Sequence, residues 1–344
     1  MTNQVFVSLI IPCRNEERFI GRCLDSIVAN DYPRNSLEVL VVDGMSEDRT
    51  KEIVEGYVRQ YPFIKILDNS KRNFTAGVNN GIKNASGDII MIVGAHATYE
   101  KNYVSNCVKF LRNYNADNAG GILIPKPFNN TDIAKAIALT LSHPFGSGNS
   151  HFRIGSKEPR WVDTVFGGCY RKEVFEKIGL FNEELPRSAD MDFNARLRKA
   201  GGKILLVPNV VAYYYPRSDL KGFLAHNFDD GFWAIYPLKF VSQTFSWRHW
   251  IPLVFILSLI ASAVLSVIFQ EFRWLLFSII GAYAILNLGT TVHVSIRERH
   301  FSYLFVLPIV LASRHFAYGL GSLFGLLLVL IPRKPWKGRR GKDV

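Results

Sequence analysis

The chain has little cysteine, and its few cysteines are not arranged for metal or disulfide chemistry. The four residues are Cys13, Cys23, Cys107 and Cys169, and they form no C-x-x-C pair. Neither a zinc ribbon nor a disulfide framework is therefore expected. The eight histidines also lack the spacing of zinc ligands. We expect the cysteines to be reduced core thiols, as in a protein that faces the cytosol.

Glycine-rich phosphate loops are missing as well. The chain contains neither G-x-G-x-x-G nor G-x-x-x-x-G-K-[ST], which disfavours dinucleotide-dependent oxidoreductases and P-loop enzymes. The first apolar run is short and lacks a basic n-region, so no secretory signal peptide is expected. We therefore expect the water-soluble part of the protein to stay in the cytoplasm.

Acidic residues are fewer than basic ones. The chain has 41 Lys and Arg against 29 Asp and Glu, which gives a formal net charge of +12. Much of the excess lies in the tail, residues 333–344, directly after an apolar segment. A basic run in this place is typical of a cytoplasmic anchor beside anionic lipid head groups, so we expect no nucleic-acid partner.

Two kinds of sequence follow one another along the chain. Residues 1–217 alternate apolar runs such as Val5–Ile11 with segments of helical periodicity, which predicts an α/β domain with a mostly parallel central sheet. Residues 218–250 mix aromatic and charged side chains, as amphipathic helices in a membrane interface do. Residues 251–332 are almost continuously apolar and predict a transmembrane or re-entrant helical region.

The apolar region contains two clear membrane spans and one ambiguous stretch. Ile251–Phe269 and Phe272–Val294 are each long enough to cross, at about 20 residues per crossing. Arg314 and His315 interrupt the third stretch, residues 303–331, and a third crossing would place the basic tail outside. We therefore predict a re-entrant or interfacial helical pair there. Arg314 and His315 either face an anionic polyprenyl-phosphate head group or reach to the interface.

Polar turns follow the predicted strands of the soluble domain. Pro12–Glu16 ends the first strand, Asp43 ends the second, and Gly94–His96 follows the fourth. The carboxyl ends of parallel strands are where ligands bind in such folds. Glu16 and Asp43 can each accept a hydrogen bond from the edge of a base, although an aspartate in this position is also a common turn former.

The segment at residues 143–160 differs in character from its surroundings. It is rich in glycine and serine and carries several basic residues. It is either a plain surface loop or a mobile lid that closes over phosphates.

Several short motifs, taken together and in this order, resemble glycosyltransferase family 2. They extend over about residues 5 to 215, and further residues resemble the membrane-anchored, succinoglycan-type branch of that family. The family motifs are Ile10-Ile-Pro-x-x-Asn-Glu16, Val41-Val-Asp-Gly-x-Ser-x-Asp-x-Thr50, Ala76-x-x-Asn-Asn-Gly-Ile82, Gly167–Arg171, Gly179–Glu184 and Asp190-x-Asp-x-Asn-x-Arg196. The branch residues are Trp161–Val165, Arg217 and Ser313-Arg-His-x-x-Tyr-Gly319.

The resemblance implies a GT-A fold, a nucleotide-sugar donor and inversion at the anomeric carbon. An inverting transfer needs a carboxylate that takes the proton from the attacking hydroxyl. Family position points to Asp190 as this base, whereas the local sequence also allows a helix N-cap. The nucleotide would contact Pro12, Arg14, Glu16, Asp43, Arg72 and Ala95, and the acceptor would contact Asp192, Arg196 and Trp233.

The chain departs from the family at the site of the divalent ion. Family members usually carry Asp-x-Asp after the fourth strand, but this chain has Gly94-Ala95-His96. His96 could bind Mn²⁺ with Asp190 or Asp192. Alternatively, His96 could stabilise the phosphates without metal, together with Lys71, Arg72 and the basic residues of 143–160, or the enzyme could be impaired. A need for Mn²⁺ or Mg²⁺ is thus left open.

We predict a membrane enzyme that transfers one sugar, from a UDP-linked donor, to a lipid-linked saccharide in polysaccharide or glycan biosynthesis. The acceptor would be linked to polyprenyl phosphate or diphosphate, and the enzyme would lie in the cell (inner) membrane. The arginine of the Gln-x-x-Arg-Trp type motif of processive relatives is absent from His226–Trp233, which favours single-sugar addition. The alternatives are a polyprenyl-phosphate glycosyltransferase and a non-catalytic sugar-nucleotide-binding membrane protein.

Overall fold

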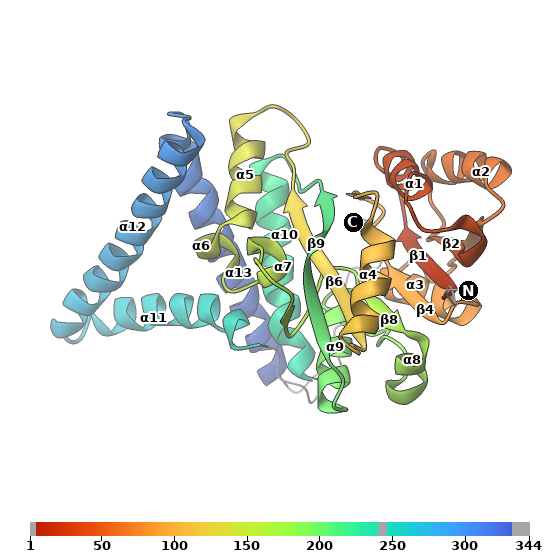
Figure 1. Cartoon of the computed structure of the whole chain (residues 1–344). Coiled ribbons are helices and arrows are strands. Elements are labelled where there is room, and N and C mark those ends of the chain that lie inside the picture. Colours follow the sequence, from red (N-terminus) through yellow and green to blue (C-terminus); the bar gives the residue numbers. More distant parts are fainter. Residues whose placement is uncertain (1–4, 240–245, 332–344) are drawn as a thin grey trace. The chain divides into compact units, whose positions relative to one another are not determined.

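The computed structural model describes residues 5–239 and 246–331, which form two compact units (Figure 1). Of the described residues, the first unit holds those up to Ile124 and His151–Tyr214, and the second holds Pro125–Ser150 and those from Tyr215 to Ile331. The boundary between Tyr214 and Tyr215 lies close to residue 217, where the sequence predicts the end of the α/β domain. Residues 125–150 belong to the second unit, which the sequence did not indicate. The predicted basic tail at 333–344 lies outside the described residues.

One half of the first unit's sheet is parallel, as predicted. Strands β1 to β4 run parallel in the spatial order β3-β2-β1-β4. Every residue of β1 and β2 is buried, which explains why these strands have continuous apolar sequence rather than alternation. Their bounds are β1 (Val7–Cys13), β2 (Leu37–Asp43), β3 (Ile64–Asp68) and β4 (Ile89–Ile92).

The other half of the sheet is largely antiparallel, so the sheet is mixed rather than mostly parallel. The spatial order continues β4-β8-β6-β9-β5, and β4 pairs antiparallel with β8. Gly167 and Gly168, which precede β8, have φ of 66° and 116°. A Cβ at Gly167 would lie 2.4 Å from the oxygen of Ile92, so only glycine lets the chain turn back beside β4. The remaining strands are β5 (Ala97–Tyr99), β6 (Asn118–Pro125), β7 (Arg160–Trp161), β8 (Cys169–Arg171) and β9 (Ile204–Tyr214).

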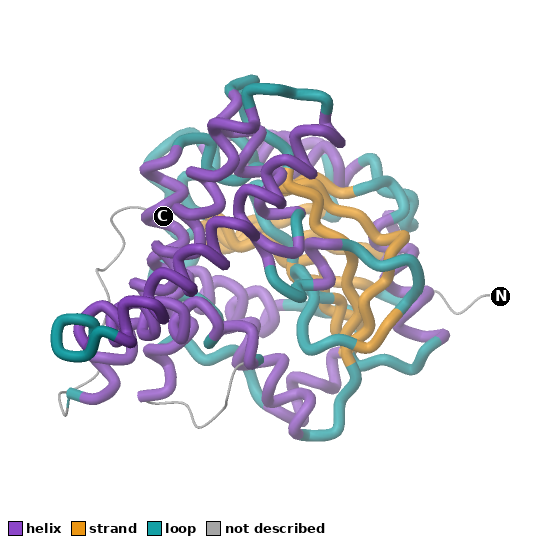
Figure 2. The backbone as a smooth tube through the Cα atoms, turned by 90° about the vertical axis from the view of Figure 1, so that its left-hand side faces the viewer, coloured by secondary structure: helices purple, strands orange, loops and turns teal. Residues whose placement is uncertain are grey.

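Helices accompany the sheet of the first unit, whose strands are drawn in orange in Figure 2. The first helix begins only at Ile20, because Asn15 has a left-handed φ of 54° and the carbonyl of Glu16 accepts from Phe19 N and Ile20 N in a turn. The helices are α1 (Ile20–Val28), α2 (Thr50–Gln60), α3 (Phe74–Asn84), α4 (Tyr103–Asn113), α7 (His151–Ile154), α8 (Lys172–Ile178) and α9 (Ala189–Lys199), with a 3-10 turn at Arg34–Ser36.

The described residues of the second unit are helical, apart from turns and connections. Three of its helices are long and apolar enough to cross a membrane: Trp247–Leu265, Glu271–Glu298 and Tyr303–Leu330. The elements are α5 (Asp132–Ser142), α6 (Pro144–Ser147), α10 (Leu220–Ile235), α11 (Ile251–Leu265), α12 (Glu271–Glu298) and α13 (Tyr303–Leu330), with 3-10 turns at Tyr236–Lys239 and Trp247–His249.

The ambiguous third stretch is one continuous helix, α13, so the prediction of a helical pair is wrong. The glycines that suggested a break are instead close-packing sites against α10. A Cβ at Gly321 would lie 2.0 Å from the oxygen of Phe228, and a Cβ at Gly325 would lie 2.9 Å from the oxygen of Phe232. Small residues let two helix backbones approach in this way. Helix α10 is thereby packed against α13 within the helical unit, and its predicted position in the membrane interface stays a prediction.

Arg314 and His315 also have a role that the sequence did not predict. The Arg314 guanidinium donates to the oxygen of Gly146 and, at 2.6 Å, to Oδ1 of Asn227. His315 Nε2 lies 2.8 Å from the oxygen of Phe145. Both side chains therefore hold α6 against α13. Contact with a lipid head group and reach to the interface both stay predictions. Within the segment at 143–160, Pro144–Ser147 is helical and thus not a plain loop, and closure over phosphates stays a prediction.

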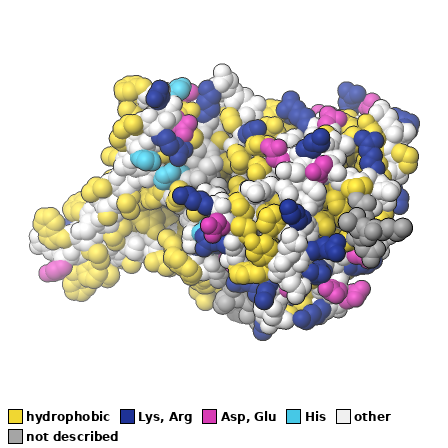
Figure 3. Space-filling model, in the orientation of Figure 1, with side chains coloured by type: hydrophobic (Ala, Val, Ile, Leu, Met, Phe, Trp, Pro, Cys, Tyr) yellow, Lys and Arg dark blue, Asp and Glu magenta, His cyan; other side chains and the backbone are white. Residues whose placement is uncertain are grey.

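The surface of α11 and α12 is strongly apolar. Val264 of α11 is 60% exposed, and Trp274 and Ile285 of α12 are 72% and 73% exposed. Hydrophobic side chains gather over these two helices in the space-filling view (Figure 3). A contiguous apolar surface of this kind marks an interaction surface for a membrane or another protein.

Candidate functional site

The carboxyl ends of the parallel strands bring the predicted nucleotide residues to one edge of the sheet. Pro12 pairs with Val42, and Cys13 pairs with Asp43. Ile10 of β1 pairs with Ile92 of β4, so the turns that follow these strands meet at the same edge. Glu16, Asp43 and His96 therefore belong to one site, although they are far apart in the sequence.

Asp43 shapes the turn that follows β2. The residue is 1% exposed, and its carboxylate accepts from Ser46 Oγ at 2.5 Å and from Ser46 N at 3.0 Å. The turn-forming alternative is thus realised. Contact between Asp43 and a base stays a prediction.

The turns after β1 and β2 are tied together by hydrogen bonds. Asn15 N donates to Ser46 Oγ at 2.9 Å, and Asn15 Oδ1 accepts from Glu47 N at 2.8 Å. Glu16 N donates to Thr50 Oγ1 at 2.7 Å. Left-handed φ values at Asn15 and at Met45 (59°) show that these turns are held in a costly backbone conformation, which is a common property of binding loops.

Two predicted nucleotide-binding arginines converge on one acidic side chain. Arg14 Nη2 and Arg72 Nη1 each lie 3.6 Å from Oε1 of Glu47. Arg72 has a φ of 57°, so the turn after β3 is also strained. The Glu47 carboxylate is well exposed, and a phosphate could take its place between the two guanidinium groups.

The turn after β4 does not fit a divalent ion of the usual kind. Gly94 has no side chain, and its N–H donates to the hydroxyl of Tyr99 at 2.7 Å. Ala95 is 2% exposed, so it supports the turn from within, and contact with a nucleotide is not supported. His96 Nδ1 lies 3.3 Å from Oε1 of Glu16. Hard cations prefer several oxygen ligands, and the described residues contain no group of three or more His, Cys, Asp or Glu side chains that could hold a metal.

Asp190 is an exposed residue in the first turn of α9. The N-cap position of this helix belongs to Ser188, which has a φ of 60°, so Asp190 is not the N-cap. Burial, and after it the negative charge of Asp190, raise the pKa of the Tyr170 hydroxyl. The helix N-terminus favours a carboxylate in this turn. The position is compatible with a base at the protein surface, and the catalytic role stays a prediction.

Asp192 and Arg196 pair with each other and with the main chain. The Asp192 side chain is 2% exposed and accepts from Arg196 Nε at 3.0 Å. The same guanidinium donates to the oxygens of Ile178 at 2.7 Å and Leu180 at 2.9 Å. The pair fastens α9 to the end of α8, so binding of the acceptor by Asp192 or Arg196 is not supported.

Trp233, the third predicted acceptor residue, lies in α10 of the second unit and is 7% exposed. Its ring packs edge-on against Phe232 and Tyr236. Because its faces are buried, stacking on a sugar is not supported.

Lys71 and Glu183 form a contact at this site that the sequence did not predict. Lys71 Nζ lies 2.5 Å from Glu183 Oε2, and Asn79 Nδ2 donates to Glu183 Oε1 at 3.2 Å. Lys71 and, after it, Asn79 lower the pKa of Glu183. Asn79 and Glu183 both lie in motifs that carried the family resemblance, which was the available signal.

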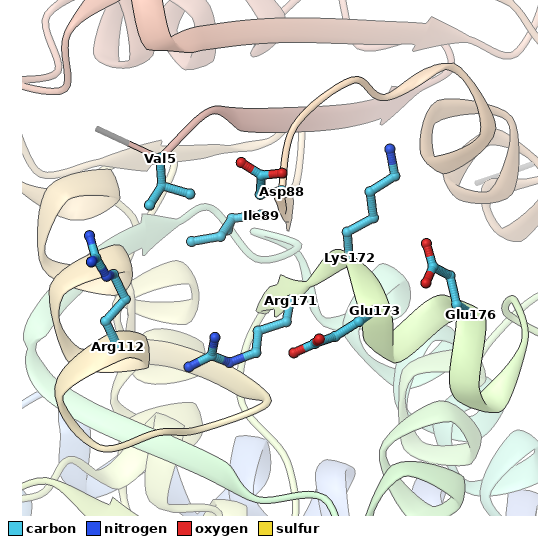
Figure 4. Close-up of a pocket in the computed structure, with 8 residues that line it drawn as sticks. All are labelled: Val5, Asp88, Ile89, Arg112, Arg171, Lys172, Glu173 and Glu176. Carbon is cyan, nitrogen blue, oxygen red and sulfur yellow. The ribbon is translucent and has the colours of Figure 1, made fainter. Parts of the chain in front are cut away.

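A pocket of the first unit lies at the opposite edge, beside the starts of β1 and β4 (Figure 4). It is lined by charged side chains of both signs. Arg171 donates to the oxygen of Ala116 at 2.9 Å, and Lys172 donates to that of Ala85 at 3.1 Å, so these cations serve the main chain. The pocket lies at the wrong end of the parallel strands for a nucleotide.

Comparison with known proteins shows to which family the chain belongs. The pattern of Glycosyl transferase family 2 matches residues 8–179. A dolichyl N-acetyl-alpha-D-glucosaminyl phosphate 3-beta-D-2,3-diacetamido-2,3-dideoxy-beta-D-glucuronosyltransferase of Methanococcus voltae is 32% identical over 331 residues, 94% of this chain and 97% of that protein. The succinoglycan biosynthesis protein ExoA of Rhizobium meliloti is 27% identical over 67% of this chain and 74% of its own length.

Among solved structures, the mannosyltransferase PcManGT of Pyrobaculum calidifontis, in complex with GDP-Man and Mn²⁺, resembles this chain with a TM-score of 0.60. It is 20% identical and covers 94% of this chain and 88% of its own. The likeness confirms the GT-A fold with a helical C-terminal region. Together with the family pattern and the Methanococcus voltae relative, the strand-end motifs show that the chain belongs to glycosyl transferase family 2 and is a glycosyltransferase.

Proposed function

We propose that the protein is an inverting glycosyltransferase that moves one sugar from a UDP-linked donor to a lipid-linked saccharide during glycan biosynthesis. The observation that carries this proposal is the similarity to the Methanococcus voltae enzyme over 94% of the chain, membrane helices included. That relative is named for transfer to a dolichyl-phosphate-linked sugar. The acceptor proposed here is a saccharide on polyprenyl phosphate or diphosphate.

The chemistry proposed for Asp190 is general base catalysis. The acceptor hydroxyl attacks the anomeric carbon, and its proton passes to the Asp190 carboxylate. The bond from that carbon to the diphosphate oxygen breaks, and the electron pair stays on the leaving nucleoside diphosphate. The exposure of Asp190 on the first turn of α9 supports this role, because a buried carboxylate could not meet an incoming alcohol.

The donor is proposed to bind at the strand-end edge. Glu16 and Asp43 would face the base, while Arg14 and Arg72 would bind phosphate oxygens in place of Glu47. Bidentate contacts between guanidinium groups and phosphate are strong and directional, which supports this assignment. The family's divalent ion fits poorly at Gly94–His96, so no step of the proposal depends on one.

The second unit is proposed to anchor the enzyme in the cell (inner) membrane, with the first unit in the cytoplasm. The three apolar helices and the exposed apolar surface of α11 and α12 support membrane insertion. A nucleotide sugar is a cytoplasmic substrate, and a lipid-linked acceptor lies in the membrane. An enzyme that joins the two needs access to both.

The test is release of nucleoside diphosphate by the full-length protein in membranes, with UDP-sugars and extracted lipid acceptor. Asp190→Asn is expected to lower turnover by about 10²–10⁴-fold while UDP affinity stays within twofold, since the amide keeps the shape but cannot take the proton. Asp31→Asn, an exposed substitution of the same type, serves as the control.

Wild-type turnover in Asp190→Asn would eliminate the proposed base. The linkage of the product separates the two enzymatic alternatives. A sugar-to-sugar bond is expected, whereas a sugar-to-phosphate bond would identify a polyprenyl-phosphate glycosyltransferase.

A further inference from the structure

Arg153 is a cation whose ring contacts lead through Tyr214 to His96, the residue two positions after Gly94. It belongs to α7 in the first unit, and its guanidinium lies over two aromatic rings. Its Cζ is 5.3 Å from the ring centre of Phe152 and 5.8 Å from that of Tyr214. Phe152 packs against the hydrophobic core, so the cation is held by a fixed support.

The sheet brings this cation to the strand-end site. Tyr214, the last residue of β9, pairs with Ala97 of β5, the residue after His96. The rings of His96 and Tyr214 are 5.9 Å apart, and His96 Nδ1 lies 3.3 Å from Glu16 Oε1. A line of contacts thus runs from Glu16 through His96 and Tyr214 to Arg153, within one compact unit.

The guanidinium of Arg153 has unused hydrogen-bonding capacity. Its Nη1 is buried, and within the described part of the chain it has no hydrogen-bond partner. A buried donor that bears charge is costly to leave unpaired, and an aromatic face does not satisfy an in-plane N–H. The residue as a whole is only partly buried. An anion is the chemical species that removes this cost.

We propose that Arg153 is a catalytic residue that binds the diphosphate of the nucleotide donor and stabilises the charge that develops on it as the sugar leaves. This inference rests on the proposed function. When the bond from the anomeric carbon to the diphosphate oxygen breaks, the electron pair remains on that oxygen. The guanidinium neutralises this charge. It thereby supplies the positive charge that a metal would supply in relatives that have a carboxylate at the position of Gly94.

The test compares UDP with UMP as ligands of the full-length protein in detergent, by isothermal titration calorimetry with EDTA and again with Mn²⁺. Arg153→Gln is expected to weaken UDP binding about tenfold or more, the size of a lost charge-assisted hydrogen bond. UMP binding is expected to change less than threefold, because UMP lacks the second phosphate. Arg153→Lys, which keeps the charge but loses the planar fork, should fall between wild type and Arg153→Gln.

Arg59→Gln is the matched control, since it removes the same charge from an exposed position on α2 and should leave both affinities unchanged. The ratio of UDP to UMP affinity is a property of the folded protein. If Arg153 had a purely structural role, Arg153→Gln would lower the melting temperature and leave this ratio unchanged. An unchanged ratio in Arg153→Gln, or wild-type binding of UDP only with Mn²⁺, would overturn the proposal. A wild-type protein that binds UDP under neither condition would instead overturn the proposed donor.

Discussion

The two units use their charged side chains in opposite ways. At the strand ends of the first unit, the partly buried Arg14 and the exposed Arg72 each lie 3.6 Å from the exposed carboxylate of Glu47. In the second unit, Arg314 is turned inward, onto the oxygen of Gly146 and the side chain of Asn227. A weak ion pair at the surface can exchange one partner for a ligand. A guanidinium that already donates hydrogen bonds to oxygens inside a helical unit has few N–H groups left for a ligand.

The same contrast exists between neighbouring residues of one helix. Asp190 and Asp192 both lie in the first turn of α9, and the family motif contains both. Asp190 is exposed, whereas Asp192 is buried against Arg196. Of these two motif carboxylates, one forms an internal ion pair and the other is open to a ligand, and their burial distinguishes them.

The largest expected effect on stability is that of Asp192→Asn. It leaves the Arg196 guanidinium without its buried countercharge, so the free energy of unfolding should fall by about 3 kcal/mol. Thermal and chemical denaturation measure this loss. Asp190→Asn, the same substitution two positions earlier at an exposed carboxylate, should lower the melting temperature much less. A stable Asp192→Asn protein that fails to use its acceptor would restore the acceptor-binding role.

Arg314→Met tests the second unit. It removes the donors to Gly146 and Asn227 and should destabilise the protein by about 2 kcal/mol, measured as the melting temperature in detergent. Arg297→Met, an exposed arginine at the end of α12, is the control and should have little effect. UDP affinity of the folded protein should be unchanged in both. If stability were retained while use of the lipid acceptor was lost, the head-group interpretation of Arg314 would be correct.

Arg72→Gln should have the smallest effect and should act only on the ligand. UDP affinity is expected to fall about tenfold, with no change in melting temperature, because the exposed pair with Glu47 contributes little to stability. Titration calorimetry measures the affinity. Arg49→Gln is the control, since Arg49 is an exposed arginine near the same edge that pairs with Glu52. An equal loss of UDP affinity in both variants would indicate a general charge effect instead of a contact.

The strand-end site could be predicted in large part because parallel strands fix the place where their carboxyl ends meet. Continuous apolar runs gave β1 and β2, and the polar turns after them lie at one edge. The antiparallel half could not be predicted in this way, because short strands such as β8 depend on partners far along the chain.

Local pattern thus determined the fold class, the family, the first two apolar helices and the position of Asp190, since each depends on periodicity or on a motif along the chain. Tertiary structure alone decided which polar groups make their hydrogen bonds and ion pairs within the protein. Trp233, Asp192 and Arg314 have the chemistry of binding residues, and only their neighbours show that this chemistry is spent on packing. Arg153 is the converse case, because its two supporting rings and its unsatisfied donor arise from segments that meet only after folding.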